Sequence, residues 1–150
     1  MKHHTITGGG GTRLHLVEAG DPDAPSILFL HGCSQSWLTW DRQMRSELAR
    51  RYRLVAMDLR GHGSSERPRD GYADSRLWAD DVDAAIRELE LDRPILSGWS
   101  YGPLLTSIRY PILTSAPWRS GHGGPWRGPG LVDRLASIRK ANPVTKQTLV

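Results

Sequence analysis

The residues of this chain with the clearest capacity for chemistry form the motif Gly-Trp-Ser-Tyr-Gly at residues 98–102. The motif places one serine between two glycines, directly after a short apolar run at residues 94–96. This pattern is typical of a sharp turn from a strand into a helix, where glycines fit on either side and the serine hydroxyl projects. Such a hydroxyl can attack a carbonyl carbon and form a covalent acyl intermediate. The spacing therefore predicts that Ser100 is a nucleophile.

A serine nucleophile needs a base that accepts its proton and an acid that orients the base. After Ser100 the chain has one histidine, His122, and one acidic residue, Asp133. His122 lies within residues 111–130, where nine of the twenty residues are glycine or proline. Such a segment cannot sustain a helix or a central strand, and a loop of this kind is poorly suited to hold a base in productive geometry. We therefore expect neither residue to complete the site.

Three short apolar runs, at residues 27–30, 54–57 and 94–96, precede the polar segments of interest. Continuous apolarity predicts strands that are covered on both faces, as in a parallel sheet. The intervals between the runs predict helices, with Asp74 or Ser75 as the cap of the second. Their apolar residues at helical spacing are Trp37, Trp40, Met44 and Leu48, then Leu77, Val82, Ile86 and Leu89. Strands alternating with helices indicate an α/β fold with right-handed crossovers, whose active site lies beyond the carboxyl ends of the strands.

The beginning of the chain predicts a hairpin. Residues 14–19 alternate between two sets of side chains, which is the period of a strand with two different faces. Four consecutive glycines at residues 8–11 come before it and predict a turn between short strands. A phosphate-binding loop is excluded because Thr12-Arg13 follows the glycines, where Gly-Lys-Ser/Thr would be required.

The residues after the first two apolar runs complete a set of three motifs. His-Gly-Cys-Ser at residues 31–34 follows the first run, and Asp-Leu-Arg-Gly-His-Gly-Ser-Ser at residues 58–65 follows the second. Together with residues 98–102, these motifs make residues 12–103 resemble the α/β-hydrolase superfamily, in the branch of esterases, cofactor-free haloperoxidases or perhydrolases and carbon–carbon bond hydrolases. The resemblance implies an α/β fold with an α/β-hydrolase-type, mostly parallel sheet and flanking helices.

The resemblance also implies roles for individual residues. Ser100 corresponds to the nucleophile, and the backbone N–H groups of Cys33 and Tyr101 correspond to the two oxyanion-hole donors. Only the amide of Cys33 is implicated, and we expect its thiol to be a small buried packing group. The family's chain order is serine, then aspartate or glutamate, then histidine. Asp133 and His122 follow Ser100 in the reverse order.

The remaining candidate side chains are expected to be structural. In the family that the chain resembles, Asp58 and His62 belong to a segment that shapes a loop near the site, and His31 supports the neighbouring loop. Trp99 adjoins Ser100 and is the candidate for a pocket wall. The other tryptophans before residue 110 have the helical spacing typical of a core, and they are Trp37, Trp40 and Trp78. The histidines near the N-terminus are scattered and are not expected to form a metal site; they are His3, His4 and His15.

Serine at position 100 also indicates the type of reaction. Haloalkane dehalogenases and epoxide hydrolases resemble this chain around the other two motifs but have aspartate at the nucleophile position. Ser100 instead points to acyl transfer on an ester, thioester, amide or lactone, with release of the acyl group by water. No cofactor and no metal ion are expected for this reaction.

The chain is predicted to contain only the N-terminal half of such a fold. Residues 1–110 are expected to form the N-terminal part of an α/β-hydrolase domain, with the later strands and the cap missing. Residues 111–150 are expected to be a Gly/Pro-rich, basic, poorly ordered tail with one short helix, native or produced by a frameshift or truncation. The predicted function is a truncated serine hydrolase of carboxylic esters or related acyl bonds with little activity. The alternative is a non-catalytic remnant or interaction module on the same scaffold.

Composition and charge limit the partners. Hydrophobic residues make up 38% of the 150 residues and charged residues 24%, which is typical of a folded domain rather than a disordered chain. The net charge of +4 comes from the tail, because residues 111–150 carry six basic residues and one acidic residue. Tryptophans among these arginines could stack on nucleic-acid bases, but we favour a basic tail without a binding role over nucleic-acid binding.

No membrane span and no signal segment are predicted, and one cysteine is compatible with the reducing cytoplasm. The expected partners are a small acyl substrate and, through an exposed sheet edge, other copies of the chain.

Overall fold

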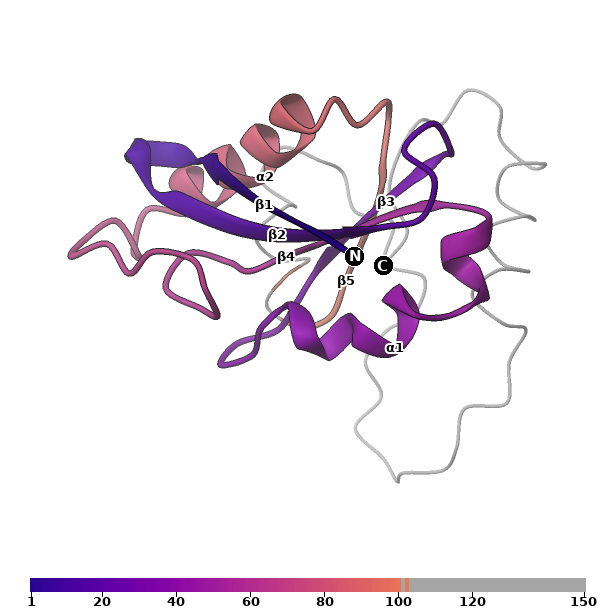
Figure 1. Ribbon diagram of the computed structural model, residues 1–150. Helices are drawn as coiled ribbons and strands as arrows, with labels where there is room; N and C mark the ends of the chain where they lie inside the picture. Colours follow the sequence, from indigo (N-terminus) through magenta and orange to yellow (C-terminus); the bar gives the residue numbers. More distant parts are fainter. Residues whose placement is uncertain (101, 103–150) are drawn as a thin grey trace.

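Five strands form one sheet in the order β1-β2-β4-β3-β5 in the computed structural model, which describes residues 1–100 and 102 (Figure 1). The strands are β1 (Lys2–Thr7), β2 (Arg13–Ala19), β3 (Ser26–Leu30), β4 (Arg53–Met57) and β5 (Ile95–Gly98). β3 pairs in parallel with both β4 and β5, whereas β2 pairs antiparallel with β1 and β4. The predicted α/β-hydrolase-type sheet is confirmed, with an antiparallel hairpin added to its parallel part.

Two of the three predicted strands, β3 and β4, are buried on both faces, as their continuous apolarity indicates, whereas β5 is mostly half-buried. Ile27, Leu28, Phe29 and Leu30 of β3 are each at most 1% exposed. Leu28 and Leu30 belong to one apolar cluster, and Ile27 and Phe29 belong to the other. The alternation of side chains along a strand therefore divides one apolar run between two cores.

The first of these cores lies under α2 (Ser75–Glu88), on the upper side of the sheet in Figure 1. Trp78, Val82 and Ala85 of this helix are buried in that cluster. The helix begins after Asp74, whose side chain accepts a hydrogen bond of 3.0 Å from the Arg76 N–H. The predicted helix is confirmed, and of the two predicted caps, Asp74 and Ser75, it is Asp74 that caps it.

The second core lies under a broken helical segment, on the opposite side of the sheet. The continuous helix predicted through residues 37–48 is wrong: the structure has η2 (Trp37–Trp40), α1 (Asp41–Met44) and η3 (Glu47–Arg50). Ser46 breaks the helix because its backbone is extended and its side chain caps the next turn through the Leu48 N–H. The helical spacing nevertheless places Met44 and Leu48 in the core, with Trp37 and Trp40 packed beside them.

The glycine run at residues 8–11 forms the turn between β1 and β2, including the short η1 (Gly9–Gly11), so the predicted hairpin is confirmed. Gly10 and Gly11 have φ angles of 63° and 80°, which glycine adopts readily. None of the helices that the described residues form is long and apolar enough to cross a membrane. The predicted tail, its helix and the boundary at residue 110 lie outside the described residues.

Candidate active site

The three predicted motifs follow three neighbouring parallel strands. β3 lies between β4 and β5, and all three run in the same direction. Their carboxyl ends therefore meet at one edge of the sheet, where sites of open α/β sheets lie. The loop at residues 31–34 leaves the middle strand and is flanked by the loop at residues 58–65 and by the turn at residues 98–102.

Ser100 occupies the turn after β5. Its φ angle is 58°, in the left-handed region that non-glycine residues seldom adopt, and the residue is exposed. The turn is held by the Trp99 N–H, which donates to the Leu30 carbonyl oxygen at 3.3 Å, and by the Gly102 N–H, which donates to the Trp99 carbonyl oxygen at 3.3 Å. Strained backbone of this kind concentrates at functional sites.

Two glycines allow β3 and its loop to approach this turn. A Cβ atom on Gly102 would lie 2.7 Å from the Leu30 carbonyl oxygen, so no larger residue fits there without movement. A Cβ atom on Gly32 would lie 3.1 Å from the Ser100 Cβ and 2.9 Å from the Trp99 Nε1. The backbone of the loop after β3 therefore packs directly against the predicted nucleophile.

Cys33 follows Gly32 in this loop. Between the described residues, no hydrogen bond uses the Cys33 backbone N–H. The expectation of a buried thiol is wrong, because Cys33 is exposed. The chain leaves the sheet at Gly32 and reverses at Ser34, where φ is 59°, so this short loop lies at the surface rather than in the core.

Two histidines hold this loop through hydrogen bonds to its backbone. His31 is fully buried; its Nδ1 donates to the Gly32 carbonyl oxygen at 2.7 Å, and its Nε2 accepts from the Leu59 N–H at 3.0 Å. Burial lowers the pKa of His31 below its usual value, more than the Gly32 carbonyl raises it. His62 donates from Nδ1 to the Arg60 carbonyl oxygen and accepts the Ser34 N–H at Nε2. These bonds give both histidines the structural role predicted for them.

Asp58 is also structural, as predicted, and it is completely buried. Its Oδ1 accepts the Trp37 N–H at 2.7 Å, and its Oδ2 accepts the Ser64 N–H at 2.9 Å. His15 donates from Nδ1 to the same Oδ2 at 2.8 Å. The sequence contains no signal for this last contact, because it depends on the register between β2 and β4. Asp58 thus joins two loops near the site to the hairpin.

No hydrogen bond between the described residues joins Ser100 to a histidine or to a carboxylate. Both ring nitrogens of His31 and of His62, the two histidines beside the site, already have backbone partners. Tyr101, His122 and Asp133 lie outside the described residues. The described part of the chain therefore contains the predicted nucleophile and one predicted oxyanion donor.

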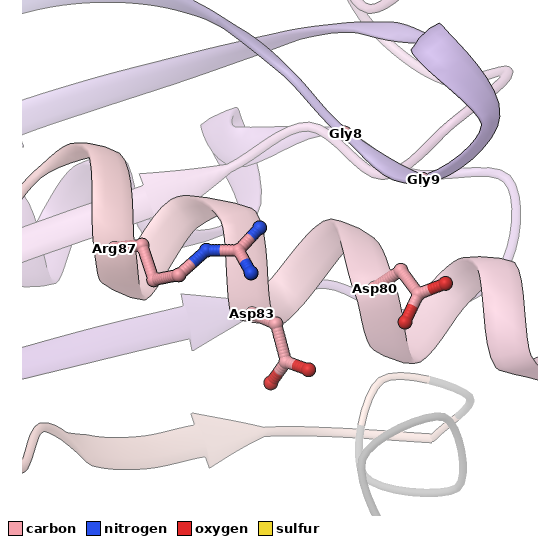
Figure 2. Close-up of a pocket in the computed structure, with 5 residues that line it drawn as sticks. All are labelled: Gly8, Gly9, Asp80, Asp83 and Arg87. Atoms are coloured by element: carbon pink, nitrogen blue, oxygen red, sulfur yellow. The ribbon is translucent and has the colours of Figure 1, made fainter.

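A depression of about 340 Å³ lies elsewhere, between the hairpin turn and α2. Figure 2 shows Asp80, Asp83 and Arg87 projecting from α2, with Gly8 and Gly9 above the helix. None of these lining residues belongs to the three loops at the strand ends. The depression is therefore separate from the candidate site at the Ser100 turn.

Comparison with known proteins agrees with the α/β-hydrolase-type fold described above. A model described as "Alpha/beta hydrolase family" matches residues 27–147. The chain therefore belongs to the alpha/beta hydrolase family.

Individual relatives include proteins named for several reactions. Over 108 residues, or 69% of this chain, it is 38% identical to epoxide hydrolase 3 of Mus musculus. Over 98 residues, or 65% of this chain, it is 37% identical to a non-heme chloroperoxidase of Streptomyces lividans. The chain spans 29% and 35% of the length of these two relatives. A solved structure of a putative aryl esterase from Burkholderia cenocepacia is similar, with a TM-score of 0.67 and 40% identity, over 69% of this chain and 39% of the esterase.

Proposed function

We propose that this chain carries the nucleophile of a serine hydrolase that cleaves carboxylic esters or related acyl bonds. The observation that carries the proposal is the position of Ser100, exposed at a φ of 58° after β5 and packed against Gly32. In the proposed reaction the Ser100 Oγ attacks the carbonyl carbon while a base takes its proton. The tetrahedral intermediate collapses to an acyl-enzyme, the leaving alcohol receives the proton, and water then hydrolyses the acyl-enzyme.

The backbone N–H groups of Cys33 and Tyr101 are the proposed oxyanion donors. The packing of Gly32 against Ser100 supports the role of Cys33, since it brings this loop to the nucleophile. One such donor typically contributes about 2.7–4 kcal/mol to stabilisation of the transition state. Neither a metal ion nor a cofactor is needed for this chemistry, and the proposed partner is a small acyl substrate.

The residue at position 100 favours an esterase reaction over epoxide hydrolysis. A carboxylate that opens an epoxide forms an ester, which water can hydrolyse to regenerate the enzyme. A serine hydroxyl that opens an epoxide would form an ether, which water does not readily hydrolyse. Since position 100 is serine, turnover by a covalent route requires an acyl substrate.

We propose that turnover by the 150-residue chain alone is low. In subtilisin, loss of the catalytic histidine costs a factor of about 2 × 10⁶ in turnover, and the base for Ser100 has no counterpart among the described residues. A second chain could supply the acid and the base.

The alternative function is a non-catalytic interaction module on the same scaffold. The cytoplasm is the proposed location, because the single thiol is free and exposed.

A fluorophosphonate probe tests the nucleophile directly, because it reacts covalently with activated serine hydroxyls. Because the base for Ser100 has no counterpart among the described residues, we expect slow labelling of the wild-type chain at Ser100, followed at high probe concentration and located by peptide mass spectrometry, and none in Ser100→Ala. Ser75→Ala is a matched control, since Ser75 is an exposed serine at the start of α2, and it should be labelled like the wild type. Equal labelling of wild type and Ser100→Ala would refute the proposal and favour the non-catalytic module.

A further inference from the structure

The side chain of Gln35 joins the loop after β3 to the turn after β5. Its Oε1 accepts the Gly32 backbone N–H at 3.1 Å and the Trp99 indole Nε1–H at 2.7 Å. Both partners can only donate, so the orientation of the amide follows from them. We infer that Gln35 is a positioning residue, which holds the Cys33 amide in place against Ser100; this inference rests on the proposed function.

The peptide group that carries the Cys33 N–H is restrained on both sides. Its carbonyl half, the Gly32 C=O, accepts from His31 Nδ1 at 2.7 Å. Because a trans peptide is planar, fixing the carbonyl direction also fixes the opposite direction of the N–H. The Ser34 N–H donates to His62, so the next peptide is held as well. The Cys33 N–H thus has a defined orientation in the protein before any substrate binds.

These restraints alone do not connect the amide to the nucleophile, because His31 and His62 hold the loop to β4 and its loop. Gln35 supplies the connection. It bonds the residue before Cys33 and, through the same oxygen, the residue before Ser100. An oxyanion donor acts only when it lies at hydrogen-bond distance from the developing charge, so the separation of these two segments matters for the rate.

If Gln35 only stabilised the fold, its substitution would lower the free energy of unfolding and leave the labelling rate of Ser100 unchanged. Gln35 is half-buried and Trp99 is 51% exposed, so water can replace their hydrogen bond at little cost to folding. Removing the acceptor should therefore leave the unfolding transition nearly unchanged. A misplacement of about 1 Å at a reacting group can nevertheless reduce a rate by about 100-fold.

The experiment compares Gln35→Met, which removes the acceptor but keeps the length, with Trp99→Phe and the double variant. The probe is a fluorophosphonate, and the quantities measured are the maximal labelling rate of Ser100 and the probe's apparent affinity. We expect Gln35→Met to lower the labelling rate by about 10- to 100-fold with unchanged affinity. Trp99→Phe breaks only the bond between the indole and Gln35, whereas Gln35→Met also removes the acceptor of the Gly32 N–H, so Trp99→Phe should lower the rate by no more than Gln35→Met does. The double variant should lose little more than Gln35→Met alone, since the indole bond is already broken in that variant.

A second readout does not depend on catalysis. Hydrogen exchange at the Trp99 indole N–H, followed by NMR, should be faster in Gln35→Met than in the wild type. Gln35→Glu, whose carboxylate also accepts an N–H, should retain slow exchange. Thermal unfolding of each variant identifies any that do not fold; if Gln35→Met is one of these, Trp99→Phe provides the kinetic test.

The outcomes separate this inference from the proposed function. A Gln35→Met chain that is labelled as fast as the wild type, or exchanges its indole proton equally slowly, overturns the role of Gln35 and leaves Ser100 as the nucleophile. Additive losses in the double variant also overturn it. A wild-type chain labelled no faster than Ser100→Ala overturns the proposed function, and this inference with it.

Discussion

His31 is the residue in which burial and hydrogen bonding select one protonation state. Its Nδ1 donates to the Gly32 carbonyl oxygen and its Nε2 accepts the Leu59 N–H, which requires the neutral imidazole with a proton on Nδ1. Burial lowers the pKa of this group, and the His62 ring, with centroids 5.1 Å apart, acts in the same direction. A proton on Nε2 would break the bond to Leu59. Acid should therefore disturb the loop after β3.

The first prediction is that His31 makes the fold sensitive to acid. Its pKa is lower in the folded chain than the usual histidine value of 6.5, so the unfolded state binds more protons as pH falls through that value. Stability contributed by neutral His31 is present above pH 6.5 and is lost progressively below it. Urea unfolding from about pH 7.5 to about pH 5 should show this decline.

His31→Asn provides the comparison, because the asparagine amide can still donate to the Gly32 carbonyl but has no titrating nitrogen. We expect a lower free energy of unfolding at neutral pH, since the Leu59 N–H loses its acceptor, together with a shallower dependence on pH. The chain has six histidines, so the difference between the two proteins is the relevant quantity. Parallel curves for the two proteins would contradict the prediction.

At the scale of elements, a buried ion pair fastens α2 to the hairpin and to the loop after β4. Arg60 contacts both carboxylate oxygens of Asp81, at 2.6 and 2.7 Å, and both side chains are 1% exposed. The Gly9 N–H donates to Asp81 at 2.8 Å. A Cβ atom on Gly8 would lie 2.3 Å from the Asp81 Oδ1. The glycines of the turn therefore permit this close approach as well as the change of chain direction.

Asp81→Asn should destabilise the chain strongly, because it leaves the charge of Arg60 buried without a counter-ion. Breaking one partner of a buried pair costs about 3–5 kcal/mol. Denaturant unfolding measures the loss, with Glu88→Gln as the control because Glu88 is exposed on the same helix. The control should change the free energy of unfolding by less than about 0.5 kcal/mol. Similar effects of the two substitutions would show that the ion pair contributes nothing specific.

At the scale of the whole molecule, the two edges of the sheet differ. β1 is one edge strand and carries mostly exposed residues. β5 pairs with β3 on one side, and no strand of the described residues pairs with its other side. β5 is also the less exposed strand, with Leu96 buried and Ile95 packed on the second core. An edge of this kind is a template for pairing with another chain.

We predict that the purified chain self-associates through β5. Light scattering coupled to size-exclusion chromatography should give a mass that rises with concentration. Ser97→Lys adds a charge to β5 and should reduce association, because edge charges oppose strand pairing. Thr5→Lys places the same charge on the exposed β1 edge and should have no such effect. A stable monomer in the wild type, or equal effects of both lysines, would contradict the prediction.

Much of the described fold could be predicted from local patterns. The apolar runs identified the three parallel strands, the glycine run identified the hairpin turn, and the pair Asp74 and Ser75 identified the start of α2. The long helix through residues 37–48 was predicted wrongly because Ser46 hydrogen-bonds its own neighbours and ends the helix. The burial of the Cys33 thiol was also predicted wrongly, since residue type does not reveal that a loop turns outward.

The amino-acid sequence by itself determined where we propose the chemistry, because the position of Ser100 after an apolar run depends only on neighbours along the chain. The tertiary structure alone decided which distant groups meet there. The bond from Trp99 to Gln35 spans 64 residues, and the bond from His15 to Asp58 spans 43. Such contacts depend on strand order, register and loop packing, which are set by burying both faces of the sheet at once.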